Sequence, residues 1–162
     1  QMHKAIDKYT DNHSVLSDSK VKLGADGHLK GVVLDLLYDH FLSQSWNQYC
    51  FVALGDFLSE FNQQAFASSR QFPDKAKNIV SRMATTNLLG KYQAFDGLVV
   101  ALERIDQRLS ARVFAKETAT QYIPALEQQY VLLKADFDVF FPQLVRYFKA
   151  HKLGSENDHF LI

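Results

Sequence analysis

The chain has 162 residues, of which 47% are hydrophobic and 22% are charged. These values are typical of one soluble globular domain with a real core, and they exclude a disordered chain. Lysine plus arginine equals aspartate plus glutamate at 18 each, so the net charge indicates neither a nucleic-acid partner nor an acidic membrane surface.

The spacing of apolar residues predicts an all-α fold, a compact single-domain helical bundle. Apolar residues recur at intervals of three and four, and no alternating strand pattern of valine, isoleucine and threonine stands out. Met2, Ala5, Ile6 and Tyr9 form the first stripe. Residues 11–14 (DNHS) then supply stop and N-cap chemistry before a second helix.

Glycine, proline and aspartate mark the ends of the later helices. Gly24 ends the second helix, Pro73 lies in the first turn of another, and Asp96 serves as an N-cap. Proline lacks the backbone donor and clashes with the preceding turn, so we expect a break at Pro124 and a kink at Pro142. In chain order, the expected helices cover residues 2–9, 14–23, 31–49, 56–66, 73–86, 87–94, 97–109 and 116–151.

We expect residues 1–154 to form the helical domain and residues 155–162 to form a tail, partly docked through Phe160 and Leu161. The lone cysteine, Cys50, excludes an intramolecular disulfide and fits a reducing compartment. The sequence shows no signal peptide and no apolar run of the roughly 20 residues that a membrane-spanning helix needs. These features predict a cytoplasmic protein without a membrane partner.

The helix around residues 32–46 (VVLDLLYDHFLSQSW) is apolar on nearly every side, which predicts a place in the middle of the bundle. It nevertheless carries Asp35, Asp39 and His40. Asp35 and Asp39 are i and i+4, so they share one face. A buried carboxylate needs a partner, and two on one face each disfavour the ionisation of the other. We therefore expect a positively charged partner near this face.

The first helix carries a matching pattern of polar residues, because His3, Asp7 and Asp11 recur at every fourth position beside its apolar stripe. If the two helices are neighbours, imidazole and carboxylate groups from both converge. Such ligands suit a divalent metal, with Mn, Fe and Zn all possible. A metal site with several carboxylates and open positions suits the hydrolysis of phosphate esters.

Each of these residues also has a purely structural interpretation. Asp11 can be an N-cap and nothing more, and His40 can hydrogen-bond to a neighbouring helix. The loop histidines His13 and His28 can be solvated or capping. Spacing alone therefore leaves open whether these groups bind a metal, take part in catalysis or form hydrogen bonds in the core.

Two segments resemble the acyl carrier protein phosphodiesterase family. Residues 3–11 (HKAIDKYTD) are similar to its H-R-x-I-D-x-x-T-D segment, and residues 31–42 (GVVLDLLYDHFL) contain its D-x-x-x-D-H-F-L motif. Residues 83–109 and 137–144 resemble later segments of the family. The resemblance covers residues 2–150, nearly the whole chain.

The resemblance implies an all-helical fold distantly related to the HD-type metal phosphohydrolases. It implies hydrolysis of the phosphodiester that joins 4′-phosphopantetheine to a serine of holo acyl carrier protein, with a divalent metal, typically Mn²⁺. Asp39 and His40 are then the catalytic candidates. The candidates for metal binding, carried over position by position, are His3, Asp7, Asp35, Asp39 and His40.

Two differences from the family pattern change what we expect of the site. Lys4 stands where the family usually has arginine, so the bidentate phosphate contact is lost and anion binding there is weaker or different. We also expect the chain to lack the family's further N-terminal segment, with its histidine and aspartate. The metal site would then be incomplete, and an apolar groove left by that segment would favour a homodimer.

A cluster of basic residues between positions 70 and 91 suggests a surface for the partner. It holds one acid, Asp74, among the basic residues Arg70, Lys75, Lys77, Arg82 and Lys91. Acyl carrier proteins are strongly acidic, so a basic surface would attract them in a salt-dependent way. The alternative is a helix face that is merely solvated.

The leading prediction is therefore a metal-dependent phosphodiesterase that acts on holo acyl carrier protein. A second possibility is a non-catalytic or truncated helical module that only binds the carrier protein. A third is an HD-like phosphohydrolase for another phosphoester.

Overall fold

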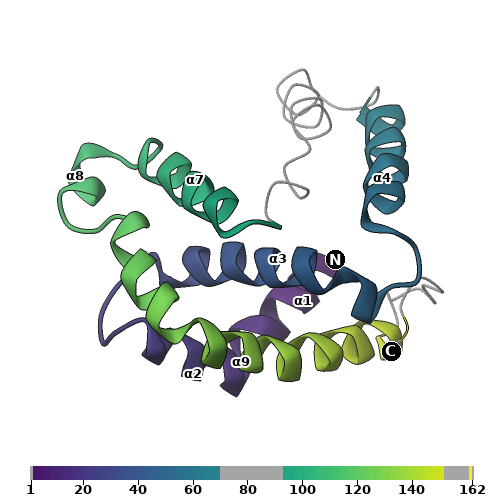
Figure 1. The fold of residues 1–162 in the computed structure, drawn as a ribbon, viewed down its shortest axis with the longest axis horizontal. Helices are drawn as coiled ribbons and strands as arrows, with labels where there is room; N and C mark the ends of the chain where they lie inside the picture. Colours follow the sequence, from purple (N-terminus) through teal and green to yellow (C-terminus); the bar gives the residue numbers. More distant parts are fainter. Residues whose placement is uncertain (1, 70–92, 152–160, 162) are drawn as a thin grey trace.

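The computed structural model describes residues 2–69, 93–151 and 161, and the regular elements in these ranges are helices (Figure 1). The predicted all-α domain is therefore confirmed for this part of the chain, while the predicted helix at 73–86 lies outside it. None of the described helices is long and apolar enough to cross a membrane. The elements are α1 (Met2–Asp11), α2 (Ser14–Lys22), α3 (Lys30–Tyr49), α4 (Leu54–Ser69), α7 (Phe95–Asp106), α8 (Ala111–Phe114), the 3₁₀ helix η1 (Thr120–Tyr122) and α9 (Ile123–Ala150).

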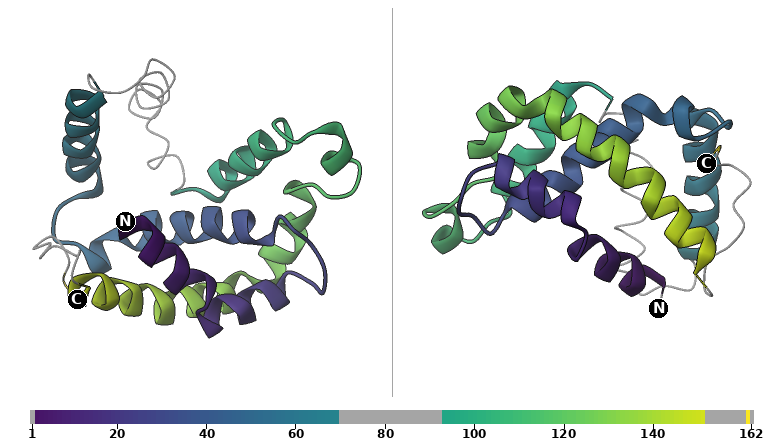
Figure 2. Two further views of the ribbon diagram at one scale, coloured as in Figure 1. Left: turned by 180° about the vertical axis from the view of Figure 1, so that it is seen from behind. Right: turned by 90° about the horizontal axis from the view of Figure 1, so that it is seen from below.

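Helix α3 is the central element. α7 packs on one side of α3, α2 and α9 pack on the other, and α1 lies against α9 (Figures 1 and 2). A helix with neighbours on several sides buries apolar residues all round, which explains the sequence of α3. Val33, Leu37 and Phe41 are fully buried and share one core with Leu133 and Phe137 of α9. Burial of each such side chain stabilises the fold by about 1.5–3 kcal/mol.

Two glycines and a buried carboxylate fix the loop that leads into α3. Gly24 follows the end of α2, as predicted, with a φ of 111° that suits glycine. Gly27 has a φ of 138°, and a Cβ at this position would lie 1.9 Å from the Tyr122 hydroxyl oxygen. The backbone N–H of Leu29 donates to Oε1 of Glu117 over 2.9 Å. The start of α3 is thus tied to the segment that precedes η1.

The ends of α7 differ from the predicted range of 97–109 and from the prediction that Asp96 is the N-cap. The helix begins at Phe95, so Asp96 lies in its first turn, where a carboxylate is favoured by the helix dipole. The helix ends at Asp106, whose buried carboxylate accepts a hydrogen bond from the Ala119 backbone N–H over 2.5 Å. This contact between distant residues ends the helix earlier than its local pattern predicts.

One of the two predictions made for prolines in the C-terminal part is confirmed. The break expected at Pro124 is confirmed, because α9 begins one residue before it and Pro124 occupies the first turn. Pro142 lies inside α9, which continues beyond it, and a kink there stays a prediction. Of the predicted tail at 155–162, only Leu161 is described, and its backbone N–H donates to the Tyr49 carbonyl oxygen over 2.8 Å.

Candidate active site

A cavity of about 620 Å³ lies between α1, α2, α3 and α9. One part of its lining is acidic, and most of the remainder is apolar and aromatic. Phe137, Phe140 and Phe141 of α9 form much of the aromatic part. The acidic part consists of Asp7 and Asp11 from α1 and of Asp35 and Asp39 from α3.

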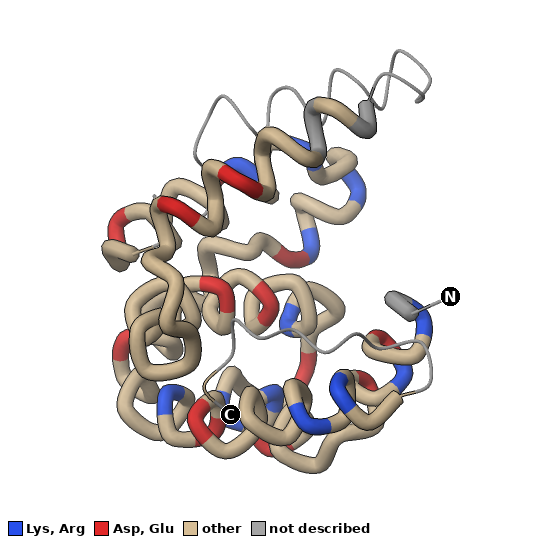
Figure 3. The backbone as a smooth tube through the Cα atoms, turned by 90° about the vertical axis from the view of Figure 1, so that its right-hand side faces the viewer, with Lys and Arg blue, Asp and Glu red and all other residues tan. Residues whose placement is uncertain are grey.

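Helix register explains why the carboxylates come in pairs. Asp7 and Asp11 are i and i+4 on α1, and Asp35 and Asp39 are i and i+4 on α3, so each pair occupies one face of its helix. The chain turns through α2 between the two helices, and both acidic faces then border the same cavity. Acidic and basic positions are interspersed along the described helices (Figure 3). Four of the acidic residues nevertheless border this one cavity.

The electrostatic environment raises the pKa of both carboxylates on α3. Burial and then the charge of Asp35 raise the pKa of Asp39 to about 6. Asp35 is exposed to solvent, yet partial burial of its carboxylate still raises its pKa. The charge of Lys20 opposes this rise, and those of Asp11 and Asp7 add to it. The neighbouring negative charges thus add to burial in making ionisation of Asp35 and Asp39 less favourable.

The donor set of this cavity fits a divalent cation in its chemistry. Four carboxylates line the cavity, and no lysine or arginine among the described residues lines it with them. A bound cation would offset the repulsion that raises the two pKa values, and carboxylate oxygens suit Mn²⁺. Within the described part, no three histidine, cysteine, aspartate or glutamate side chains converge tightly enough to hold one ion. The side chain of His3 lies outside the described part, so its predicted role stays a prediction.

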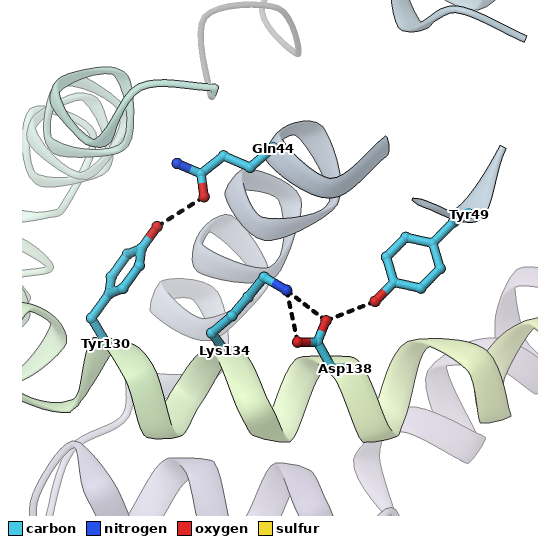
Figure 4. A network of polar contacts seen from close by, with 5 residues as sticks. All are labelled: Gln44, Tyr49, Tyr130, Lys134 and Asp138. Atoms are coloured by element: carbon cyan, nitrogen blue, oxygen red, sulfur yellow. Dashed lines mark hydrogen bonds and ion pairs between the residues drawn. The ribbon is translucent and has the colours of Figure 1, made fainter. Parts of the chain in front are cut away.

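His40 occupies a different side of α3 from the acidic pair. Its ring is fully buried and lies edge-on to Phe95 of α7, and it is not among the residues that line the cavity. The Tyr130 hydroxyl lies 2.7 Å from Nε2 of His40. It donates its hydrogen to Oε1 of Gln44 over 3.0 Å (Figure 4). Nε2 must then be the donor to Tyr130. This is the hydrogen bond to a neighbouring helix that the sequence left open, while metal binding by His40 stays a prediction.

The sequence comparisons identify the family of this chain. The family model for acyl carrier protein phosphodiesterase matches residues 1–144. The chain belongs to this family. No solved structure matches the chain significantly.

Two curated members of the family show how far the similarity extends. The acyl carrier protein phosphodiesterase of Yersinia pestis is 26% identical over 149 residues, which cover 90% of this chain and 74% of the relative. That of Klebsiella pneumoniae strain 342 is 25% identical over 147 residues, with the same coverage of both chains. The family resemblance of the sequence is therefore confirmed over most of the chain.

The remaining predicted site residues fall in different places. Lys4 is exposed on α1, next to the acidic face. Asp11 lines the cavity and is the last residue of α1, and the N-cap of α2 is His13, so the N-cap interpretation of Asp11 is wrong. His13 is not simply solvated, since its Nε2 lies 3.2 Å from Oε1 of Gln143. The predicted basic residues Arg70, Lys75, Lys77 and Arg82 lie outside the described residues.

Sequence reasoning missed a polar chain that begins at the cavity wall. Tyr38 lines the cavity, and its hydroxyl oxygen lies 2.9 Å from Oγ of Ser19 on α2. Ser19 donates to Oδ2 of Asp136 over 2.6 Å, so Tyr38 must be the donor to Ser19. Burial raises the pKa of Tyr38 to about 12, which keeps this donor protonated. Asp136 also pairs with Lys22 at 2.6 Å. Tyr38 follows Asp35 by one helical turn, and this spacing was the available signal.

Proposed function

We propose that this chain is a metal-dependent phosphodiesterase that removes 4′-phosphopantetheine from the serine of holo acyl carrier protein. The observation that carries the proposal is a cavity lined by four carboxylates in a member of the acyl carrier protein phosphodiesterase family. The relatives from Yersinia pestis and Klebsiella pneumoniae bear that name. Such a reaction would take place in the cytoplasm, where carrier proteins act in fatty acid synthesis.

The residues proposed to hold the metal come from the two acidic faces. Asp7, Asp35 and Asp39, together with His3, offer carboxylate and imidazole ligands that suit Mn²⁺, with Fe and Zn as alternatives. When bound, a divalent ion polarises a phosphoryl oxygen and lowers the pKa of a bound water. Because no three described groups already converge, we expect the aspartate side chains to change rotamer when the ion binds.

Asp39 is the proposed general base of the reaction. In the metal-free chain the pKa of Asp39 is about 6, so its carboxylate is mostly ionised at neutral pH. A nearby cation would keep it ionised, and the carboxylate could then accept a proton from the attacking water. Water attack on phosphorus breaks the bond to the serine oxygen of the carrier protein. The proton that Asp39 receives can then pass to that oxygen as it leaves. The aromatic residues Phe140 and Phe141 limit the access of other water to this side of the cavity.

The partner surface is proposed to be the basic cluster at residues 70–91, which lies outside the described residues. Its support is the sequence, in which Lys75 and Lys77 belong to a run with a strong excess of positive charge. Charge reversal of both lysines to glutamate should weaken binding of holo acyl carrier protein at low salt. Unchanged binding would remove this surface from the proposal. The homodimer expected from the sequence also stays a prediction, which light scattering would test.

Mass spectrometry of the carrier protein tests the proposed activity directly. Holo acyl carrier protein is incubated with the chain and Mn²⁺, and conversion to the apo form is followed. We expect conversion with the wild type, its loss with Asp39→Asn, and its retention with Asp18→Asn. Asp18 is a matched control because it is exposed on α2 and does not line the cavity.

Each negative result of this assay has a defined meaning. If Mn²⁺, Fe²⁺ and Zn²⁺ all leave the holo protein intact, the proposed activity is overturned. Binding of the carrier protein without hydrolysis would favour the non-catalytic module. Hydrolysis of small phosphodiesters alone would favour a phosphohydrolase for another substrate.

A further inference from the structure

Lys20 lies on α2 near the cavity, although it is not among the residues that line it. Leu16, which lines the cavity, precedes Lys20 by one helical turn, and residues i and i+4 share one face of a helix. Ser19, the neighbour of Lys20, bonds to Tyr38 on α3, so this part of α2 is held against α3. Lys20 itself is partly buried. Helix register and the contact between Ser19 and Tyr38 therefore place a lysine near the part of the cavity that α2 and α3 share.

The charge of Lys20 acts on that wall. It lowers the pKa of Asp35, against the burial and the negative charges of Asp7 and Asp11 that raise it. The next lysine along α2, Lys22, is different, because its Nζ is paired with Asp136 at 2.6 Å. In the described part of the chain, no carboxylate forms such an ion pair with Lys20. Its ammonium group is therefore available to a ligand.

A phosphodiester cannot enter this cavity without a compensating positive charge. Its own negative charge would meet four carboxylates, and like charges in a partly desolvated site repel strongly. A bound metal ion would neutralise some of the carboxylate charge, but its own positive charge would be largely balanced by the carboxylates that bind it. A separate cation beside the carboxylates would favour the phosphate itself, as lysine does in many phosphate sites.

We propose that Lys20 binds a non-bridging oxygen of the substrate phosphate where α2 and α3 border the cavity. This assignment rests on the proposed phosphodiesterase function, and it adds a substrate-binding residue from a helix that neither motif of the family resemblance includes. It also differs from the expectation for Lys4, which is more exposed and lies on α1. A lysine that only offset the charge of Asp35 would change the affinity for the metal and the pH dependence of stability. It would leave the affinity for phosphate unchanged.

The test measures binding of inorganic phosphate and of 4′-phosphopantetheine to the full chain in the presence of Mn²⁺, by calorimetry. Lys20→Met removes the charge and keeps most of the side-chain length, and Lys20→Arg restores the charge. Lys8→Met is the matched control, because Lys8 is exposed on α1 and, unlike Lys20, is not among the charges that shift the pKa of Asp35. Binding of Mn²⁺ alone is measured for every variant.

We expect Lys20→Met to weaken binding of both phosphate ligands about tenfold or more, as loss of a charged hydrogen bond predicts. Lys20→Arg should recover most of the affinity, and Lys8→Met should match the wild type. Mn²⁺ should bind Lys20→Met as tightly as the wild type or more tightly, since a repelling charge has been removed. Unchanged phosphate affinity in Lys20→Met would overturn the assignment, and so would a parallel loss of Mn²⁺ and phosphate binding.

The outcome is separable from that of the proposed function. If the wild type fails to hydrolyse holo acyl carrier protein but binds 4′-phosphopantetheine through Lys20, the activity is overturned and the phosphate site stands. If the wild type hydrolyses the carrier protein and Lys20→Met binds and turns it over equally well, the activity stands and the role of Lys20 is overturned.

Discussion

Asp7 of α1 and Asp35 of α3 line the same cavity, and the negative charge of Asp7 adds to the burial that raises the pKa of Asp35. The two residues come from helices that are separated along the chain by α2. A fold that brings like charges together from separate helices loses stability unless a proton or a cation offsets them. The free energy of unfolding should therefore depend on pH and on bound cations.

The first prediction concerns pH and Asp39. The pKa of Asp39 is about 6 in the folded chain, against an ordinary value of 3.8. Between these pH values the folded chain retains a proton that the unfolded chain has lost, so the free energy of unfolding falls as pH rises through this window. Asp39→Asn should remove this fall and, after allowance for solvent screening, raise the metal-free free energy of unfolding at pH 7 by about 1–2 kcal/mol.

Urea unfolding of wild type and variant between pH 4 and pH 7, with a chelator present, checks this prediction. The two curves should converge near pH 4 and separate by pH 7. Asp18→Asn should follow the wild type throughout. A variant that is less stable than the wild type at pH 7 would contradict the raised pKa of Asp39.

The second prediction concerns metal content. The wild type should contain roughly stoichiometric Mn, Fe or Zn after purification, and Asp35→Ala and Asp39→Ala should both contain much less, because each removes a carboxylate ligand. Elemental analysis measures this directly. Circular dichroism should show that both variants are folded. Metal-free wild type that also fails to bind added Mn²⁺ would argue against the metal site.

The third prediction concerns the loop before α3. Gly27→Ala should destabilise the fold by about 2 kcal/mol or more, because the residue has a positive φ and the new Cβ would clash with the Tyr122 hydroxyl. Gly31→Ala is the matched control, since Gly31 lies in α3 with open space around it. It should be neutral or stabilise by up to about 1 kcal/mol. Thermal unfolding of both variants checks the prediction, and similar melting temperatures would contradict it.

The fourth prediction concerns the hydrogen bond between His40 and Tyr130. Tyr130→Phe removes the hydroxyl that pairs with His40 and Gln44, and should lower the free energy of unfolding by about 1–2 kcal/mol. If His40 acts only through this hydrogen bond, away from the cavity, His40→Gln should lower stability in the same way and leave Mn²⁺ affinity unchanged. Calorimetric titration with Mn²⁺ checks this. Loss of Mn²⁺ binding in His40→Gln but not in Tyr130→Phe would instead place His40 among the ligands.

Much of the helical organisation was predictable because it depends on local chemistry. The glycine after α2 and the proline in the first turn of α9 mark helix boundaries through backbone properties of single residues. The C-terminal end of α7 was not predictable, since the carboxylate of Asp106 bonds to the backbone of Ala119, beyond the helix itself. Local patterns do not contain such a partner.

The candidate site was likewise predictable only in part. The pairing of Asp35 with Asp39 follows from helical periodicity, and their place on an apolar helix already indicated that they need a partner. His40 is adjacent to Asp39 in the sequence, but consecutive residues lie about 100° apart around a helix, so the two need not face the same neighbour. The arrangement of α7 and α9 around α3 placed His40 against Tyr130.

By itself, the sequence determined that this protein is all-α, that it belongs to a phosphodiesterase family and that two of its helices carry paired carboxylates. These properties depend on residue type and on spacing along one helix. Only the tertiary structure decided that both pairs border one cavity, that His40 lies on another side of α3 and that the charge of Lys20 acts on Asp35. The reason is physical: the direction that a helix face takes is fixed by its packing against helices that are distant in the chain.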